Sequence, residues 1–227
     1  MALPTELRLM IAEYALYCED GLIWYWKSNT PGEKVGGFKD RAMQHDHPRY
    51  GCDNPITRLC LSRQLRQETS SLWTKVNTVC FSSQEESPHS FKIRNQKAVT
   101  DYDYFFKHDT TRTLARIPTV ILEVFTITHD MAAMCSLSEV TLGGRHPEIR
   151  VIETGFSLDC HSRHGARRFR SFMRMMEKAI RKCESVTGKR IWKVYPITSS
   201  PEFMECLRKF LSPEDLSSAL DFIEKGI

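Results

Sequence analysis

The sequence that decides the fold is LPTELRLMIAEYAL, Leu3–Leu16, together with LCLSRQLRQETSSLWTKVNTVCF, Leu59–Phe81. Apolar side chains in the first stretch recur three and one residues apart, which is the pattern of one face of an α-helix. That face consists of Leu7, Met10, Ile11, Tyr14 and Ala15. We expect the helix to end near Cys18, because Glu19-Asp20-Gly21 is a stop signal and glycine often follows the C-terminus of a helix.

The second stretch repeats this pattern, and Asn77 then interrupts the helix before a strand-like run that ends at Phe81. Its apolar stripe consists of Leu61, Leu65, Leu72 and Val76. Each helix can bury a stripe only against another element. We therefore predict that the two helices pack together, with the leucines of both in the core.

The C-terminal half alternates strand and helix patterns. A long amphipathic helix at 166–186 separates two strand-like runs, and a helix that links two strands favours a parallel crossover between them. The predicted strands are 119–128, 148–159 and 190–197, followed by helices at 201–211 and 213–225. The sequence therefore predicts an α+β fold, in which the N-terminal helices pack on a small mixed sheet with flanking helices.

Length and composition suit one domain over 1–227, with 41% hydrophobic residues and a net charge of only +4. Within it, we expect a helix-and-strand unit at 1–81, with a long loop at 28–55, and a sheet-and-helix body at 101–227. No apolar run approaches the roughly 20 residues that cross a bilayer, so we expect no membrane association.

The motif Leu3-Pro4-x-Glu6-Leu7 resembles the opening of an F-box. Together with Arg63-Gln64-Leu65-Arg66-x-Glu68 and Asn77-Thr78-x-x-Phe81, it makes the chain similar to a large family of uncharacterised fungal F-box-like proteins. The resemblance implies a protein-interaction role and no enzyme activity. The implied partner is a Skp-type adaptor of a ubiquitin ligase, which would contact Leu3, Pro4, Leu7 and Ile11.

Charged residues on the two N-terminal stretches predict a structural contact between them. Glu6 and Glu13 lie on the first helix, and Arg63 and Arg66 lie on the second. The planar guanidinium of arginine suits a fixed carboxylate. We expect at least one arginine–carboxylate pair between the helices.

A row of cations on the long helix 166–186 suggests an alternative function. Arg163, Arg167, Arg170 and Arg174 begin the row, and Lys178, Arg181 and Lys182 continue it. Such a row is commonly the solvated side of a packed helix, but it is also suited to phosphate groups. Binding of nucleic acid or phosphate through this helix is therefore the second hypothesis.

Two short motifs could carry chemistry. Asp159-Cys160-His161 offers a thiol next to an imidazole, but the motif of a nucleophile elbow is absent. His45, His47 and Cys52 offer three metal ligands without a fourth nearby. A cysteine-dependent or metal enzyme is thus the least favoured alternative, and we expect no catalytic residue, metal or cofactor.

The cysteines also bear on where the protein resides. They stand at 18, 52, 60, 80, 135, 160, 183 and 206, with no close pair among them. This spacing favours buried thiols in a reducing compartment, the cytoplasm or the nucleus.

Overall fold

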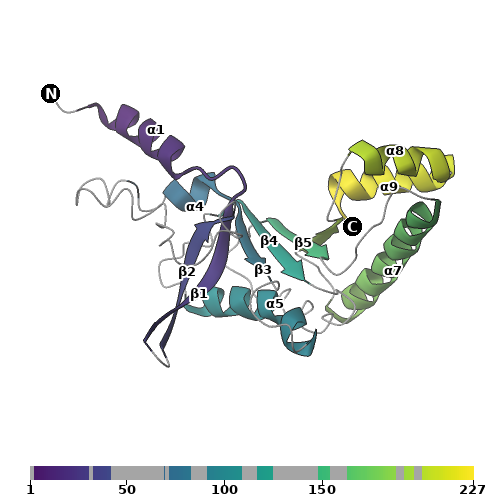
Figure 1. Ribbon diagram of the computed structural model, residues 1–227, viewed down its shortest axis with the longest axis horizontal. Helices are drawn as coiled ribbons and strands as arrows, with labels where there is room; N and C mark the ends of the chain where they lie inside the picture. Colours follow the sequence, from purple (N-terminus) through teal and green to yellow (C-terminus); the bar gives the residue numbers. More distant parts are fainter. Residues whose placement is uncertain are drawn as a thin grey trace. The chain divides into compact units, whose positions relative to one another are not determined.

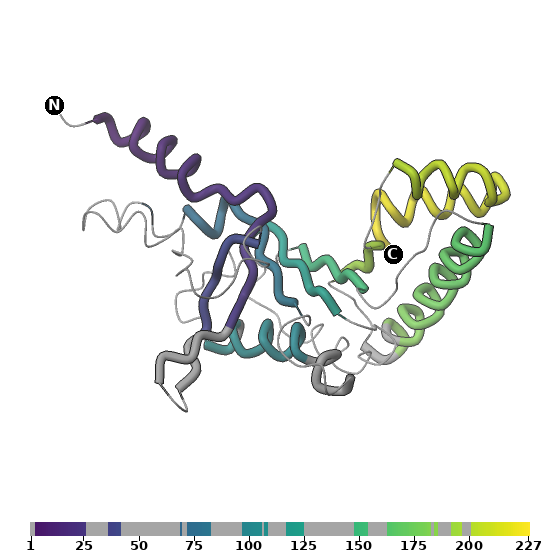
Figure 2. The backbone as a smooth tube through the Cα atoms, in the orientation of Figure 1, coloured from purple at the N-terminus to yellow at the C-terminus, as the bar shows by residue number. Residues whose placement is uncertain are grey.

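The structure is a computed structural model, and it describes residues 3–30, 33–41, 69, 72–82, 91–108, 117–124, 148–153, 163–187, 192–196 and 201–227. Figures 1 and 2 follow the chain through these segments from purple to yellow. The helices are α1 (Thr5–Leu16), α4 (Leu72–Val76), α5 (Phe91–His108), α7 (Arg163–Thr187), α8 (Pro201–Phe210) and α9 (Pro213–Lys225). The strands are β1 (Leu22–Thr30), β2 (Glu33–Asp40), β3 (Val79–Ser82), β4 (Thr119–Val124), β5 (Glu148–Glu153) and β6 (Trp192–Tyr195).

The strands form one mixed sheet in the order β2-β1-β3-β4-β5-β6. Strand β1 pairs antiparallel with β2 and parallel with β3, and β5 pairs parallel with β6. The α+β prediction is confirmed, and so is the parallel pairing of the two strands that α7 connects. By contact density the chain forms two compact units: Met1–Ser82 with Thr100–Ile121 and Leu142–Glu148, and Ser83–Val99 with Leu122–Thr141 and Ile149–Ile227.

The segment 28–55, which we expected to be a loop, contains the end of β1 and the whole of β2. Two glycines of this segment belong to the strand, where Gly36 is opposite Trp26 and Gly37 is opposite Tyr25. A Cβ atom on Gly36 would lie 1.9 Å from Cζ2 of Trp24. Gly36 is therefore needed for the close approach of an indole ring and not for a turn.

Aromatic rings fill the core of the first unit. Trp24 lies 5.0 Å from Phe38 and 5.0 Å from Phe105 between ring centroids, and Phe38 lies 5.2 Å from Phe105. Phe81 of β3 is fully buried and packs edge-on against Tyr102 of α5. Helix α5 runs from Phe91 to His108, and Ala98, Val99 and Tyr102 on it are buried.

Burial of Tyr102 makes the stability of the fold sensitive to alkaline pH. Burial, with a smaller effect from the charge of Asp103, raises the pKa of Tyr102 to about 12, whereas tyrosine in an unfolded chain titrates near pH 10. Between about pH 10 and 12 the unfolded chain loses a proton that the folded protein keeps. Stability should therefore fall as the pH rises through this window, by about 3 kcal/mol in total.

Urea unfolding on both sides of pH 10 measures this effect. Tyr102→Phe should remove the additional alkaline loss, while Tyr104→Phe, which removes an exposed hydroxyl from the same helix, serves as the control. The prediction is wrong if Tyr102→Phe retains the whole loss.

The second unit packs around the apolar side of α7. Phe169 lies 5.0 Å from Phe203 of α8 and 5.8 Å from Phe222 of α9 between ring centroids. Phe172, Met173, Met176 and Ile180 are also buried. The predicted helix and its core-facing stripe are confirmed. Helix α9 starts as its sequence predicts, with Oγ of Ser212 accepting a hydrogen bond from N–H of Asp215.

Candidate interaction site

Helix α1 packs on α4 through a narrow side. Ala12 and Leu16 are buried with Leu72, and Leu9 packs against them from α1. The remaining contacts come from Trp73 and Val76. The predicted contact between the N-terminal helix and the 59–81 segment is therefore present at its 72–76 portion, while Leu61 and Leu65 lie outside the described residues.

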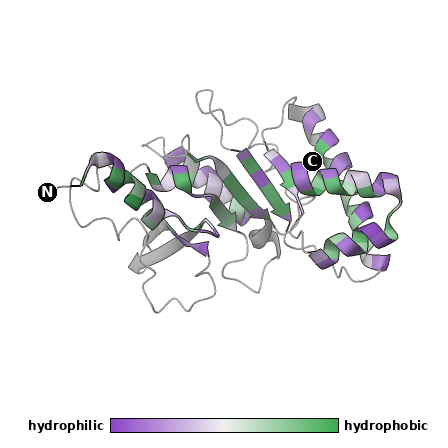
Figure 3. Ribbon diagram, turned by 90° about the horizontal axis from the view of Figure 1, so that it is seen from above, coloured by the Kyte–Doolittle hydropathy of each residue, from purple (hydrophilic) through white to green (hydrophobic). Residues whose placement is uncertain are grey.

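The other side of α1 carries large apolar side chains that are exposed. The exposed fractions are 52% for Leu3, 45% for Leu7, 64% for Met10, 58% for Ile11 and 88% for Tyr14. At 100° per residue Leu7, Met10, Ile11 and Tyr14 gather on the side opposite Leu9, Ala12 and Leu16, and Leu3 belongs to the segment just before the helix. We call this set the outer face of α1; Figure 3 colours much of this helix, beside the N label, as hydrophobic.

This arrangement corrects the prediction that the face made of Leu7, Met10, Ile11, Tyr14 and Ala15 is the buried side of the helix, because all five residues are exposed. The helix is apolar on two opposite sides. The side with the larger side chains was predicted to be the buried one. The short helix α4 instead packs against the side of α1 with the smaller contact surface, at the centre of which lies Ala12. A sequence shows both stripes, but only the tertiary packing decides which one is buried.

Charged groups border the outer face of α1. Glu6 and Glu13 lie along one edge and Arg8 lies along the other, at their helical positions. Arg8 donates hydrogen bonds to the carbonyl oxygen of Leu3 (2.6 Å) and to Oγ1 of Thr5 (3.0 Å). The predicted partners of the two glutamates, Arg63 and Arg66, lie outside the described residues. The outer face is thus an apolar stripe with acidic groups on one side.

Asn77 fastens the C-terminal end of α1 to the rest of the first unit. Its Oδ1 accepts a hydrogen bond from N–H of Cys18 (2.8 Å), and its Nδ2 donates to the carbonyl oxygens of Leu16 (2.8 Å) and Trp73 (2.9 Å). The side chain is buried, so one amide satisfies groups from the ends of two helices. The sequence marked Asn77 only as a helix breaker.

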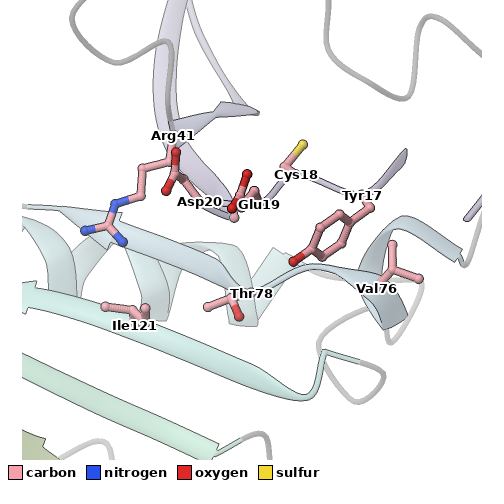
Figure 4. A pocket seen from close by; sticks show the side chains of 9 residues that line it. Tyr17, Cys18, Glu19, Asp20, Arg41, Val76, Thr78 and Ile121 are labelled. Atoms are coloured by element: carbon pink, nitrogen blue, oxygen red, sulfur yellow. The ribbon is translucent and has the colours of Figure 1, made fainter. Parts of the chain in front are cut away.

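A hollow of about 310 Å³ lies beside this junction. Figure 4 shows Tyr17 and Val76 at one end and the guanidinium of Arg41 at the other, with Glu19 and Asp20 between them. The lining carries one cation and two carboxylates, so its charges partly offset each other.

The predicted basic patch on α7 is divided by the structure. Nε of Arg170 lies 2.9 Å from Oδ1 of Asp215, an ion pair whose N–H is not directed at the oxygen and is therefore not a hydrogen bond. Nη2 of Arg174 lies 3.9 Å from the same oxygen. Arg163 and Arg167 are exposed. Arg170 thus connects α7 to α9, and the other three arginines remain at the surface.

The candidate catalytic and metal-binding motifs lie outside the described residues. This applies to Asp159, Cys160, His161, His45, His47 and Cys52. Within the ranges that the structure describes, no group of three His, Cys, Asp or Glu side chains is placed to hold a metal ion. Cys18, Cys80 and Cys206 are buried thiols, as the sequence predicts.

Two surfaces of the described part of the chain are therefore candidates for function: the outer face of α1 and the cationic side of α7. None of the helices in that part combines the length and apolar character needed to cross a membrane. Comparisons with protein-family models, with curated proteins and with solved structures found no match.

Proposed function

We propose that this chain is a non-catalytic protein-interaction module that docks through the outer face of α1. The exposed apolar side chains of that helix carry the proposal. Of the eight large hydrophobic side chains exposed among the described residues, six lie between Leu3 and Tyr17. A contiguous patch of exposed apolar side chains on a folded domain commonly marks an interaction site.

The geometry of the face indicates the kind of partner surface that would fit it. Leu7, Met10, Ile11 and Tyr14 present anchors three, one and three residues apart along one side of α1, and the exposed Leu3 precedes the helix. This is the spacing with which an amphipathic helix enters an apolar groove on another protein. Glu6 and Glu13 favour a groove with cations along the corresponding edge.

The F-box resemblance suggests a specific partner for this face. Leu3, Pro4, Leu7 and Ile11 are the residues that the resemblance assigns to contact with a Skp-type adaptor. All four are exposed, which such a contact requires. A Skp-type adaptor of a ubiquitin ligase is therefore the partner that we propose, with the chain acting in the cytoplasm or nucleus.

The test is calorimetric titration of the full chain with a purified Skp-type adaptor. Leu7→Ser together with Ile11→Ser should weaken binding more than a hundredfold, because each buried aliphatic side chain contributes about 1.5–3 kcal/mol. Unfolding of the free chain should change by less than about 0.5 kcal/mol, since both side chains are exposed. Met175→Ser, which removes an exposed apolar side chain from α7, is the matched control and should bind as the unmodified chain does.

Two results contradict this proposal. One is an adaptor that does not bind, or that binds the double variant equally well. The other is self-association that the double variant abolishes, observed by analytical ultracentrifugation in place of adaptor binding, because a second copy would then occupy the face.

A further inference from the structure

The cationic side of α7 has a composition that packing does not explain. Six cations share the side of the helix opposite its buried residues: Arg163, Arg167, Arg174, Lys178, Arg181 and Lys182. We call this set the outer face of α7. It extends about 28 Å along the helix axis. The two acidic residues of α7, Glu177 and Glu184, lie toward its buried side and are only partly exposed.

The charge of this face is largely uncompensated. Among the described residues, Arg163, Arg167, Lys178 and Lys182 form no ion pair. Arg174 reaches Asp215 at 3.9 Å with 66% of its side chain exposed, and Arg181 reaches Glu177 at 4.0 Å with 81% exposed. Exposed pairs at such distances contribute little, so the positive potential persists.

The row is unfavourable for the isolated helix. Arg163 and Arg167 are four residues apart, and Lys178 lies four residues from Arg174 and from Lys182. Like charges at this spacing destabilise a helix by about 0.2–0.5 kcal/mol per pair. An anion that binds along the face would remove this cost, which makes a ligand with many regularly spaced negative charges the natural complement.

The residues around the outer face of α7 indicate which class of polyanion fits it. The apolar side of α7 is already packed against α8 and α9 and cannot insert into a lipid surface. Apart from the imidazole of His164 in the first turn, no aromatic side chain lies among the described exposed positions of α7, so successive bases of a single strand would have no row of rings on which to stack. A duplex needs neither feature, because its phosphates are bound by charge alone.

We propose that the outer face of α7 binds the phosphate backbone of duplex nucleic acid without sequence preference. This role is separate from adaptor docking through α1. Arg170, engaged with Asp215, takes no part, whereas Lys178, Arg181 and Lys182 extend the surface by more than two helical turns beyond Arg174.

The test is fluorescence anisotropy of a labelled duplex of about 20 base pairs with the full chain, at salt concentrations from about 50 to 200 mM. The affinity should fall steeply with salt and should be the same for unrelated duplex sequences. Arg167→Gln with Lys178→Gln should lower the slope of log K against log salt by about two and weaken binding on the order of a hundredfold at the lowest salt. Arg167→Glu with Lys178→Glu should abolish binding.

The matched control is Lys75→Glu with Arg208→Glu, because it makes the same change of net charge at exposed positions on α4 and α8. This control should retain most of the affinity. All of these substitutions are at exposed positions, and circular dichroism verifies that each variant is folded.

Four outcomes overturn the proposal: no binding at low salt, a slope that the α7 variants leave unchanged, equal loss in the control, or tighter binding to anionic vesicles or polyglutamate than to the duplex. The last would assign the face to a lipid headgroup or an acidic protein.

Discussion

Replacing Asn77 with alanine is expected to destabilise the protein by about 3–4 kcal/mol and to release α1. The substitution removes three hydrogen bonds, to N–H of Cys18 and to the carbonyl oxygens of Leu16 and Trp73. Each buried polar group left without a partner costs about 1–3 kcal/mol. Because all three groups lie where α1 and α4 end, the loss concentrates at their junction.

Urea unfolding measures the loss of stability, and hydrogen exchange of the amides in α1 measures its release. Asn77→Asp separates the two functions of the amide, since a carboxylate accepts from Cys18 but cannot donate to Leu16 or Trp73. We expect it to recover little stability. Lys75→Ala on the exposed side of α4 is the control and should cost less than about 0.5 kcal/mol. Equal exchange rates in α1 for Asn77→Ala and the unmodified protein would contradict the assigned role.

Replacing Gly36 with alanine is expected to destabilise the first unit by about 3 kcal/mol. The new methyl group would lie 1.9 Å from Cζ2 and 2.2 Å from Cη2 of Trp24, far inside contact distance. Trp24 has no room to move, because Phe38, Phe81 and Phe105 surround its ring. Crowding of this kind typically costs 1–3 kcal/mol, and it costs more when aromatic packing is lost.

The adjacent glycine provides a matched control. A Cβ atom on Gly37 would meet Cε1 of Tyr25 at 3.5 Å, which is ordinary van der Waals contact. Gly37→Ala should therefore change stability by less than about 0.5 kcal/mol. Urea unfolding monitored by tryptophan fluorescence compares the two variants. Similar losses at both positions would show that strand propensity, and not contact with Trp24, sets the requirement for glycine.

The sequence is sufficient to predict a long element that has apolar residues on only one side. Helix α7 shows this clearly, because Phe169, Met173, Met176 and Ile180 leave only one orientation that buries them. The parallel pairing of β5 with β6 followed from the helix between them. The strand that contains Gly36 could not be recognised, because its glycines carry the sequence signature of a loop while serving the ring of Trp24.

The sequence indicated which residues form the candidate site, but not which side of α1 is exposed. The resemblance selected Leu3, Leu7 and Ile11, whereas the helical periodicity assigned Leu7 and Ile11 to the core. Periodicity cannot decide between two apolar sides of a helix, since the choice depends on the element that packs there. The role of Asn77 was also hidden, because its partners Leu16 and Cys18 are about 60 residues away in sequence.

The two sides of α1 separate the residues that stabilise the fold from those that we propose for recognition. Under the proposed docking role, changes among the outward anchors would alter which molecule is captured with little effect on the folding equilibrium, whereas changes at Ala12 or Leu16 act on the fold first. A lineage could therefore retarget this helix by successive neutral steps, without the loss of solubility or abundance that usually limits the divergence of binding surfaces.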